Sequence, residues 1–251
     1  SAEFFDLVAG THTATSSGPA VARALAGLDT ADGVIVDIGA GTGLVTAAVA
    51  RALPDAEILA CEPATGMRAV LTSRVFGDPD LRRRVTVTDG SAPDLELPDR
   101  IGAAILCGVL GHLDAGQREH LWSRLRERLV PGGRVVVELM GVAEPVTLPP
   151  ARMATAHAGR HRYEWWFSGA PDPEDASAMR LHSAYRVFDA AGEDGAAPLR
   201  EVHDSYRWIP FGLDRVAEES GLRTRPLTAR PGGPPLAVLT PDPITPTEDQ
   251  P

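Results

Sequence analysis

Two amino acids are absent from this chain. None of its 251 residues is lysine, so all 24 basic residues are arginine, and none is asparagine. The absence of lysine excludes Schiff-base chemistry and the usual phosphate-binding P-loop, whose motif ends in lysine. The absence of asparagine excludes N-linked glycosylation and any catalytic asparagine. Several large enzyme classes are therefore excluded at the outset.

Cysteines and long apolar runs are also scarce. Cys61 and Cys107 stand alone in apolar surroundings, without the spacing of metal ligands. This pattern argues against a disulfide framework and against a bound metal. No apolar run approaches the eighteen or so residues of a membrane span, so we expect no membrane contact and a cytoplasmic location. The net charge of −10, from 34 acidic and 24 basic residues, argues against a nucleic-acid partner.

The first half of the chain alternates between strand-like and helix-like segments. This alternation predicts an α/β fold, doubly wound (Rossmann-like), with a mainly parallel sheet. We assign residues 21–141 and 211–240 to this core, and the latter part is expected to add a helix and a closing pair of strands. The charged residues of the helix predicted at 117–129, Arg118 among them, are expected to form a solvated face. The strand-like runs are 34–36, 57–61, 85–88, 103–107 and 134–140, and the helical ones include 44–53 and 67–75.

Residues 142–210 have a different pattern. Three segments with two-residue periodicity, at 162–168, 178–189 and 199–209, predict antiparallel strands. The preceding stretch, 142–160, is rich in proline and alanine and is expected to be irregular. We interpret the whole insertion as a small antiparallel β lid. Residues 1–20 are expected to lie near the active site, and 241–251 to form a disordered tail.

The most informative motif runs from Val34 to Gly43, with the sequence VIVDIGAGTG. Its three glycines follow a buried strand and open a helix, which allows a ligand to approach the backbone closely. The spacing G-x-G-x-G is not the G-x-G-x-x-G of dinucleotide folds, and Asp37 beside it favours a cation over a pyrophosphate. Glu62, about 20 residues further on at the end of the next strand, suits ribose hydroxyls. A ribose, a positive charge and no phosphate describe S-adenosylmethionine (SAM).

The pair D-I-G-A-G-T-G and A-C-E-P resembles class I SAM-dependent methyltransferases over residues 20–140, and the insertion is similar to that of bacterial natural-product and peptide tailoring methyltransferases. The resemblance implies SAM as methyl donor and S-adenosylhomocysteine (SAH) as product. Ser91 replaces the acid with which the family contacts adenine, and Asp89 is expected to compensate. The cofactor residues implied are Asp37, Gly39, Ala40, Gly41, Gly43, Glu62, Pro63, Met67, Asp89, Gly90, Ser91 and Cys107.

Aromatic residues are concentrated in the insertion. Nine of the thirteen lie between residues 163 and 211. We interpret them as a wall over the cofactor's methyl group, where cation–π contacts stabilise positive charge, although such stripes also serve packing alone. The candidate substrate-binding residues are Phe5, His112, Glu138, Tyr163, Trp165, Tyr185, Tyr206 and Trp208.

Methyl transfer requires collinear positioning of nucleophile and methyl group. An amine acceptor needs only to be neutral, whereas a hydroxyl needs a general base. His112, in the loop after the fourth strand, is the first candidate base, and His182 and His203 on the insertion are the others. We expect N-methylation of a small molecule or peptide. O-methylation with His112 as base, C-methylation, a non-catalytic SAM-binding protein and a homodimer formed through the lid stay open, while Leu44 and Asp37 disfavour a nicotinamide-dependent oxidoreductase.

Overall fold

A seven-stranded sheet forms the centre of the computed structural model, which describes residues 2–8, 17–191, 197–227 and 233–242. Strands β1 to β5 run parallel, and β11 is antiparallel to both β5 and β10. The predicted doubly wound, mainly parallel sheet is thereby confirmed. In spatial order the strands are β10 (Arg223–Leu227), β11 (Leu236–Thr240), β5 (Leu129–Glu138), β4 (Ile101–Cys107), β1 (Val34–Ile38), β2 (Ile58–Cys61) and β3 (Val85–Thr88).

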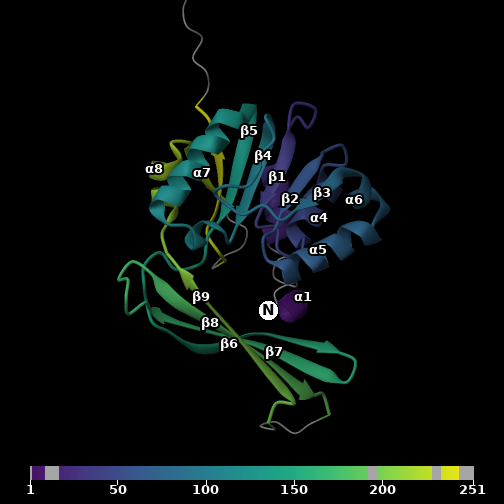
Figure 1. Cartoon of the computed structure of the whole chain (residues 1–251), viewed down its shortest axis with the longest axis vertical. Coiled ribbons are helices and arrows are strands. Elements are labelled where there is room, and N and C mark those ends of the chain that lie inside the picture. The colour runs from purple at the N-terminus through teal and green to yellow at the C-terminus, as the bar shows by residue number, and fades with distance from the viewer. Residues whose placement is uncertain (1, 9–16, 192–196, 228–232, 243–251) are drawn as a thin grey trace, which may run out of the picture.

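Helices cover both faces of this sheet (Figure 1). Successive residues of a strand point to opposite faces, so Ile35 of β1 packs into one apolar cluster and Val36 into the other. The first cluster is covered by α3 (Gly18–Ala24), α4 (Leu44–Ala52), α5 (Thr65–Gly77) and α6 (Pro79–Arg84), and the second by α7 (Ala115–Arg128) and α8 (Leu213–Ser220). Because β1 and β4 lie side by side while their crossover helices leave in opposite directions, ligands are expected at the carboxyl ends of these strands.

Arg118 on α7 is a correction to the sequence analysis. The helix begins at Ala115, and not at the predicted residue 117, with a capping box formed by Asp114 and Gln117. Arg118, however, is only 2% exposed. Its guanidinium donates to both carboxylate oxygens of Glu219 on α8 and lies over the ring of Phe211, 4.6 Å from the centroid. A charge is tolerated in the interior when it is fully paired in this way.

A second sheet of four antiparallel strands lies beyond the carboxyl ends of the parallel strands (Figure 1). It consists of β6 (Leu148–Ala158), β7 (His161–Pro171), β8 (Met179–Asp189) and β9 (Arg200–Trp208), in that order. The sequence predicted three of these strands. The prediction that residues 142–160 are irregular was wrong, because they contain β6. Pro149 and Pro150 obscure the pattern, but β6 is an edge strand with register shifts, where proline costs little.

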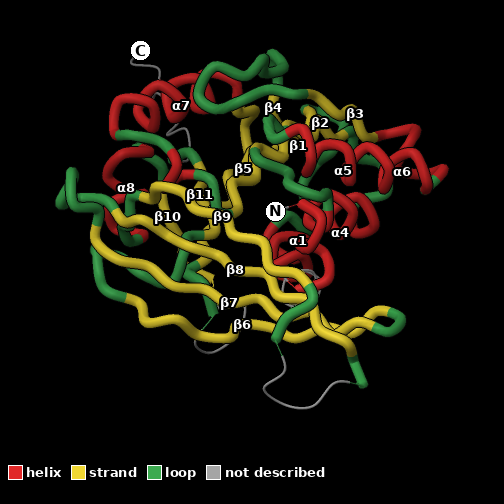
Figure 2. The backbone as a smooth tube through the Cα atoms, turned by 60° about the horizontal axis from the view of Figure 1, so that its bottom comes forward, coloured by secondary structure: helices red, strands yellow, loops and turns green. Residues whose placement is uncertain are grey.

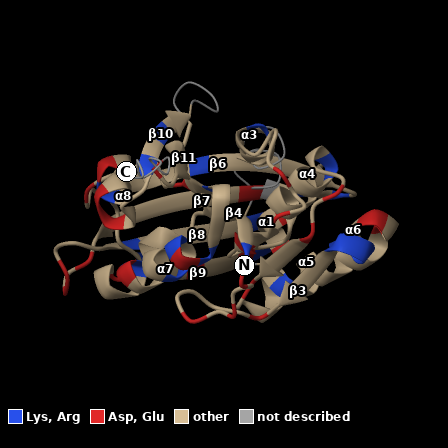
Figure 3. Ribbon diagram, turned by 90° about the horizontal axis from the view of Figure 1, so that it is seen from above, with Lys and Arg blue, Asp and Glu red and all other residues tan. Residues whose placement is uncertain are grey.

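A short helix, α1 (Ala2–Val8), lies where the antiparallel sheet approaches α4 and α5 (Figures 1 and 2). The proline-initiated helix α3 is short and ends at Ala24. Of the predicted tail, only residues 241 and 242 are described. Acidic and basic positions are interspersed over the molecule (Figure 3). Among the described helices, none combines the length and apolarity needed to cross a bilayer.

Candidate active site

The glycine loop after β1 forms the floor of the candidate site. Gly39, Gly41 and Gly43 all have positive φ, at +71°, +58° and +82°. A side chain at Gly39 would lie 2.5 Å from Val109, and one at Gly43 would lie 2.5 Å from Leu71, so these two glycines serve packing. Gly41 differs, because a Cβ there would meet nothing within 4 Å. The backbone at Gly41 thus faces open space, as a ligand-binding loop requires.

Glu62 connects this loop with the start of α5. One carboxylate oxygen accepts a hydrogen bond from the Gly41 amide and the other from the Ala64 amide, each at 2.8 Å. A carboxylate has about four acceptor sites, so two remain for other donors. Pro63 is exposed and Met67 half-buried just beyond it. The two unused acceptor sites suit the vicinal hydroxyls of a ribose, as the sequence predicts.

Asp37 is buried at the end of β1, with 2% of its surface exposed. It accepts a hydrogen bond from the Thr46 hydroxyl at 2.5 Å. Burial raises the pKa of Asp37 to about 6, the Thr46 bond lowers it in part, and the nearby charge of Glu62 raises it further. A cation bound nearby would favour the ionised carboxylate.

The carboxyl ends of β4 and β5 place Cys107 beside Glu138. Burial, followed by the charges of Glu138 and Asp37, raises the pKa of Cys107 well above its ordinary value, so this thiol stays neutral and is no nucleophile. Burial also raises the pKa of Glu138, against a hydrogen bond from Ser17 that lowers it. One carboxylate oxygen of Glu138, Oε2, is buried and has no hydrogen-bond partner among the described residues. A buried acceptor without a donor is costly and fits a site that receives an ammonium group.

The loop after β3 carries three further predicted cofactor residues. Asp89 and Ser91 are exposed, and a Cβ at Gly90 would lie 2.9 Å from the Cβ of Leu95. Arg124 of α7 holds this loop by donating to the carbonyls of Pro93 and Leu95. Asp89 and Ser91 are thus both open to a ligand at this edge of the sheet.

His112 lies in η2 (Leu110–His112), the short helical turn that follows β4. Its ring is 5.4 Å from that of Tyr206 and 4.9 Å from that of Trp208, centroid to centroid. The side chain is exposed, yet loss of hydration lowers its pKa, so the imidazole is neutral at physiological pH. Arg118 of α7 stabilises this turn by donating a hydrogen bond to the Leu113 carbonyl at 2.7 Å. The His112 ring is therefore held in place by its aromatic neighbours, and its lowered pKa favours the neutral form.

The aromatic candidates of the insertion share one side of the antiparallel sheet. Strand alternation and register put them on what we term the inward face, which contacts α1 and η2. Tyr185 and Trp208 are buried there, and the remaining three are half-buried. The members predicted from sequence are Tyr163, Trp165, Tyr185, Tyr206 and Trp208.

His182 and His203 are corrections to the predicted catalytic set. Both are exposed and occupy the opposite, outward face, because their strand positions alternate with those of Leu181 and Tyr206. His203 lies 3.5 Å from Glu201 of its own strand. The structure therefore does not bring them together with His112, and we do not retain them as bases.

Helix α1 connects the glycine loop with the inward face. Asp6 accepts a hydrogen bond from the Thr42 hydroxyl at 2.6 Å and forms an ion pair with Arg74. Phe4 is fully buried and stacks on Tyr185 with 5.2 Å between ring centroids. Phe5 is half-buried. Phe4 therefore makes the contact with the antiparallel sheet, next to Phe5, the predicted substrate-binding residue.

The residues at this edge fit SAM. Gly41 offers open space beside the backbone, Glu62 has spare acceptor sites, and Glu138 holds a buried oxygen without a donor. Together these groups match a nucleoside that carries a positively charged amino group and no phosphate. No pyrophosphate is expected beside two buried carboxylates, which excludes the dinucleotide alternative.

Comparison with known proteins agrees with this geometry. Residues 35–133 match a family described as a methyltransferase domain. The chain carries a methyltransferase domain. No curated protein matches its sequence.

The whole fold, with the antiparallel sheet included, is similar to that of several solved structures, methyltransferases among them. DesVI of Streptomyces venezuelae superposes with a TM-score of 0.74 at 19% identity, over 95% of this chain and 96% of that one. SAM-bound CalS10 of Micromonospora echinaspora, an amino pentose methyltransferase of calicheamicin biosynthesis, gives 0.67 at 18% identity, over 89% of each chain. KedS8 of Streptoalloteichus sp., a sugar N-methyltransferase, gives 0.67 at 17% identity, over 91% of this chain and 87% of that one.

Proposed function

We propose that this protein transfers a methyl group from SAM to a nitrogen atom of a small-molecule amine during natural-product tailoring. The observation that carries the proposal is the pairing of two surfaces. One is the edge formed by the carboxyl ends of the parallel strands, which suits a cationic nucleoside. The other is the aromatic inward face of the antiparallel sheet, where Tyr206 and Trp208 lie against His112. SAM supplies an electrophilic methyl group when it is bound at such an edge.

The chain's own residues contribute binding and orientation. Glu62 and the Gly41 backbone position the nucleoside, while Asp37 and Glu138 stabilise positive charge. The aromatic inward face excludes water and stabilises cationic groups. The acceptor nitrogen uses its lone pair for the new C–N bond, the departing sulfur keeps the electron pair of the broken bond, and the proton lost from nitrogen passes to water.

An amine acceptor is supported by its chemistry, because a neutral amine attacks the methyl group without the help of a general base. It is supported further by KedS8, whose reported activity is sugar N-methylation, and by CalS10, which acts on an amino pentose. A peptide amine is the other nitrogen acceptor that the sequence leaves open.

One observation favours a second candidate function. His112 is neutral and exposed at the edge where the acceptor would lie, which is what a general base for a hydroxyl requires. O-methylation with His112 as base is therefore the alternative to N-methylation.

Label transfer tests the proposal. The protein is incubated with SAM carrying an isotopically labelled methyl group and a small-molecule extract of the source organism, and mass spectrometry locates the label. Label on an amine nitrogen supports the proposal, and the H112Q variant should then keep most of its turnover. Label on oxygen, abolished by H112Q, establishes the alternative.

Two further outcomes concern the cofactor. SAH binding measured by calorimetry, with no label transferred to any fraction, favours a non-catalytic SAM-binding protein. Failure to bind either SAM or SAH overturns the proposed function altogether.

A further inference from the structure

Glu62 is held at each polar group of its backbone and side chain. Its amide donates to the Thr88 carbonyl of β3 at 3.0 Å, and its carbonyl accepts from the Arg68 guanidinium at 2.7 Å. Its two carboxylate oxygens accept from the amides of Gly41 and Ala64. Because these two amides fix the side chain relative to the backbone, the direction of the carboxylate depends on where the backbone of Glu62 is held.

Arg68 holds that backbone from the first turn of α5. One of its terminal nitrogens, Nη1, donates to two successive carbonyls, those of Glu62 at 2.7 Å and Pro63 at 2.8 Å. The Arg68 side chain is half-buried. A guanidinium presents its donors in a rigid planar fork, so it defines the positions of the acceptors that it binds. The two carbonyls before the helix are thus fixed relative to α5.

The start of α5 carries alanine where a capping side chain is usual. The N-cap residue is Ala64, and alanine has no group that could accept from the first amides of the helix. The residue before it, Pro63, has no amide hydrogen. Glu62 accepts from the Ala64 amide, and Arg68 donates to the two preceding carbonyls. The shape of this loop therefore depends on these two charged side chains together.

The place of Arg68 on α5 is unfavourable for the helix itself. The N-terminal end of a helix dipole is positive, so a cation in the first turn is destabilising there. Arg74, the other arginine of α5, lies in the last turn, where a cation is favourable. The stability of α5 alone thus gives no reason for a cation at position 68, whereas the need to hold the backbone of Glu62 does.

We propose that Arg68 is a positioning residue of the cofactor site, which sets the Glu62 carboxylate for both hydroxyls of a ribose. The inference rests on the proposed function and refines how the site selects its nucleoside. Arg68 acts through Glu62: it holds the two carbonyls, and the two unused acceptor sites of the carboxylate then meet the pair of hydroxyls at once. Without Arg68 the carboxylate keeps its charge but no longer engages both hydroxyls together.

The test compares SAH with its 2′-deoxy analogue, which lacks one of the two ribose hydroxyls. Both compounds are titrated calorimetrically into the full-length protein. The wild type should bind SAH about thirtyfold more tightly than the analogue, the effect of one hydrogen bond to a charged group. In Arg68→Met, SAH should bind more weakly and the preference should fall to about threefold, because the carboxylate is no longer held in place.

Arg68→Lys and Arg51→Met are the matched variants. A lysine ammonium has three donors and can bind both carbonyls, so Arg68→Lys should keep most of the preference. Arg51→Met removes an exposed arginine from the last turn of α4 and should leave the preference unchanged. A purely structural role for Arg68 would weaken the binding of SAH and of the analogue by the same factor. That result, in which Arg68→Met keeps the wild-type preference, would overturn the proposal.

The wild-type titrations separate this inference from the proposed function. If the wild type binds SAH without any preference over the 2′-deoxy analogue, the role of Arg68 fails and the proposed methyl transfer does not. If the wild type binds neither compound, the proposed function fails. Circular dichroism reports whether Arg68→Met is folded; if it is not, Arg68→Gln takes its place in the comparison, with the same reduced preference expected.

Discussion

At the scale of single residues, Asp37 combines burial with an elevated pKa of about 6. The native state therefore binds this proton more tightly than the unfolded chain does, in which the pKa is near 3.8. The contribution of Asp37 to stability is fully present below about pH 4 and lost as the pH rises through 6, a total of about 3 kcal/mol. The Asp37→Asn side chain is neutral at every pH and can still accept the hydrogen bond from Thr46, so the stability of this variant should not fall over this pH range for this reason.

Urea denaturation of both proteins between pH 4 and 7.5 measures this effect. The variant should gain stability relative to the wild type as the pH rises, because only the wild type acquires the buried charge. Taking the difference between the two proteins removes the contributions of all other titrating groups. A difference that stays constant over this range would contradict the assignment.

Glu62 offers a second prediction at this scale. Its oxygens order the glycine loop through Gly41 and are expected to bind the ribose, so Glu62→Ala removes both functions. We expect the affinity for SAH to fall by about 10²-fold, corresponding to the loss of two hydrogen bonds to a charged group. Calorimetry measures the change, and Glu57→Gln, an exposed glutamate at the start of β2, is the control. Unchanged SAH affinity in Glu62→Ala would place the ribose elsewhere.

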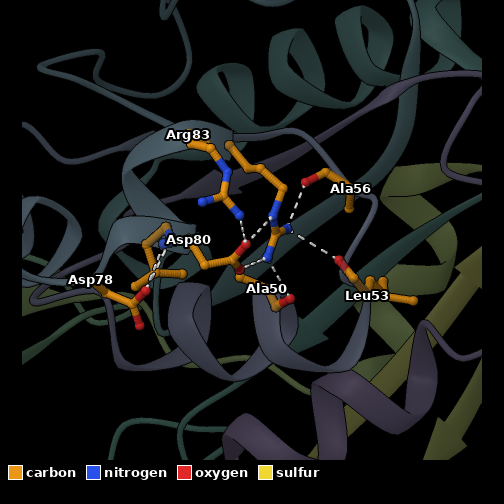
Figure 4. A network of polar contacts seen from close by, with 8 residues as sticks. Ala50, Leu53, Ala56, Asp78, Asp80 and Arg83 are labelled. Atoms are coloured by element: carbon orange, nitrogen blue, oxygen red, sulfur yellow. Dashed lines mark hydrogen bonds and ion pairs between the residues drawn. The ribbon is translucent and has the colours of Figure 1, made fainter.

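At the scale of elements, the chain at the end of α4 is held by Arg84 of α6, whose partners Ala50, Leu53 and Ala56 are labelled in Figure 4. Arg84 donates to the carbonyls of Ala50, Leu53 and Ala56, which satisfies acceptors that the helix end leaves unpaired. It is also held by Asp80. This guanidinium thus secures the helix that follows the glycine loop.

Arg84→Met should therefore destabilise the protein by about 2–3 kcal/mol, because it leaves the part-buried carbonyls of Ala50, Leu53 and Ala56 without their donor. Arg83 provides a matched control, since it is largely exposed and pairs with Asp80 alone. Arg83→Met should cost less than about 0.5 kcal/mol. Chemical denaturation compares the two, and equal losses would show that the contacts to the α4 carbonyls contribute nothing.

The elements of the parallel core could be predicted because each carries its own local pattern. Val34 to Val36 is a buried β-branched run, and residues 117–129 have the pattern of a helix, although the cap at Asp114 was missed. Strand β6 was missed because Pro149 and Pro150 break the pattern that identifies strands, and an edge strand tolerates them. Local sequence likewise gave no sign that Arg118 is buried, since its partner Glu219 lies a hundred residues away.

At the scale of the whole molecule, the cofactor loop was predictable and the contacts between the two sheets were not. The glycines, Asp37 and Glu62 are recognised from spacing along the chain. The alternation of β8 and β9 placed the aromatic residues on one face, but it did not reveal which face turns inward. That choice depends on contacts such as Gly111 against Trp208, where any Cβ would clash with the indole. His182 and His203 were misassigned for the same reason.

Helix α1 is the contact through which the cofactor loop and the lid are joined. Asp6 and Arg74 attach it to the glycine loop, and Phe4 attaches it to Tyr185 of the lid. The ion pair of Glu3 with Arg200 is exposed to solvent and contributes little, whereas the buried Phe4 ring contributes about 3 kcal/mol or more. The stack, and not the salt bridge, should therefore couple the two parts.

Hydrogen exchange tests this coupling. In the wild type, SAH should slow amide exchange in the glycine loop, in α1 and in β8 around Tyr185. In Phe4→Ala, SAH should still protect the glycine loop, but the protection of β8 should be lost, because the contacts of the Phe4 ring with Tyr185 and Tyr163 of the lid are gone. Arg200→Met, which removes the exposed ion pair and the guanidinium over the Phe4 ring but leaves the stack of Phe4 on Tyr185, should behave like the wild type. Protection of β8 that persists in Phe4→Ala would mean that the lid senses the cofactor directly, across the inward face, and not through the N-terminal helix.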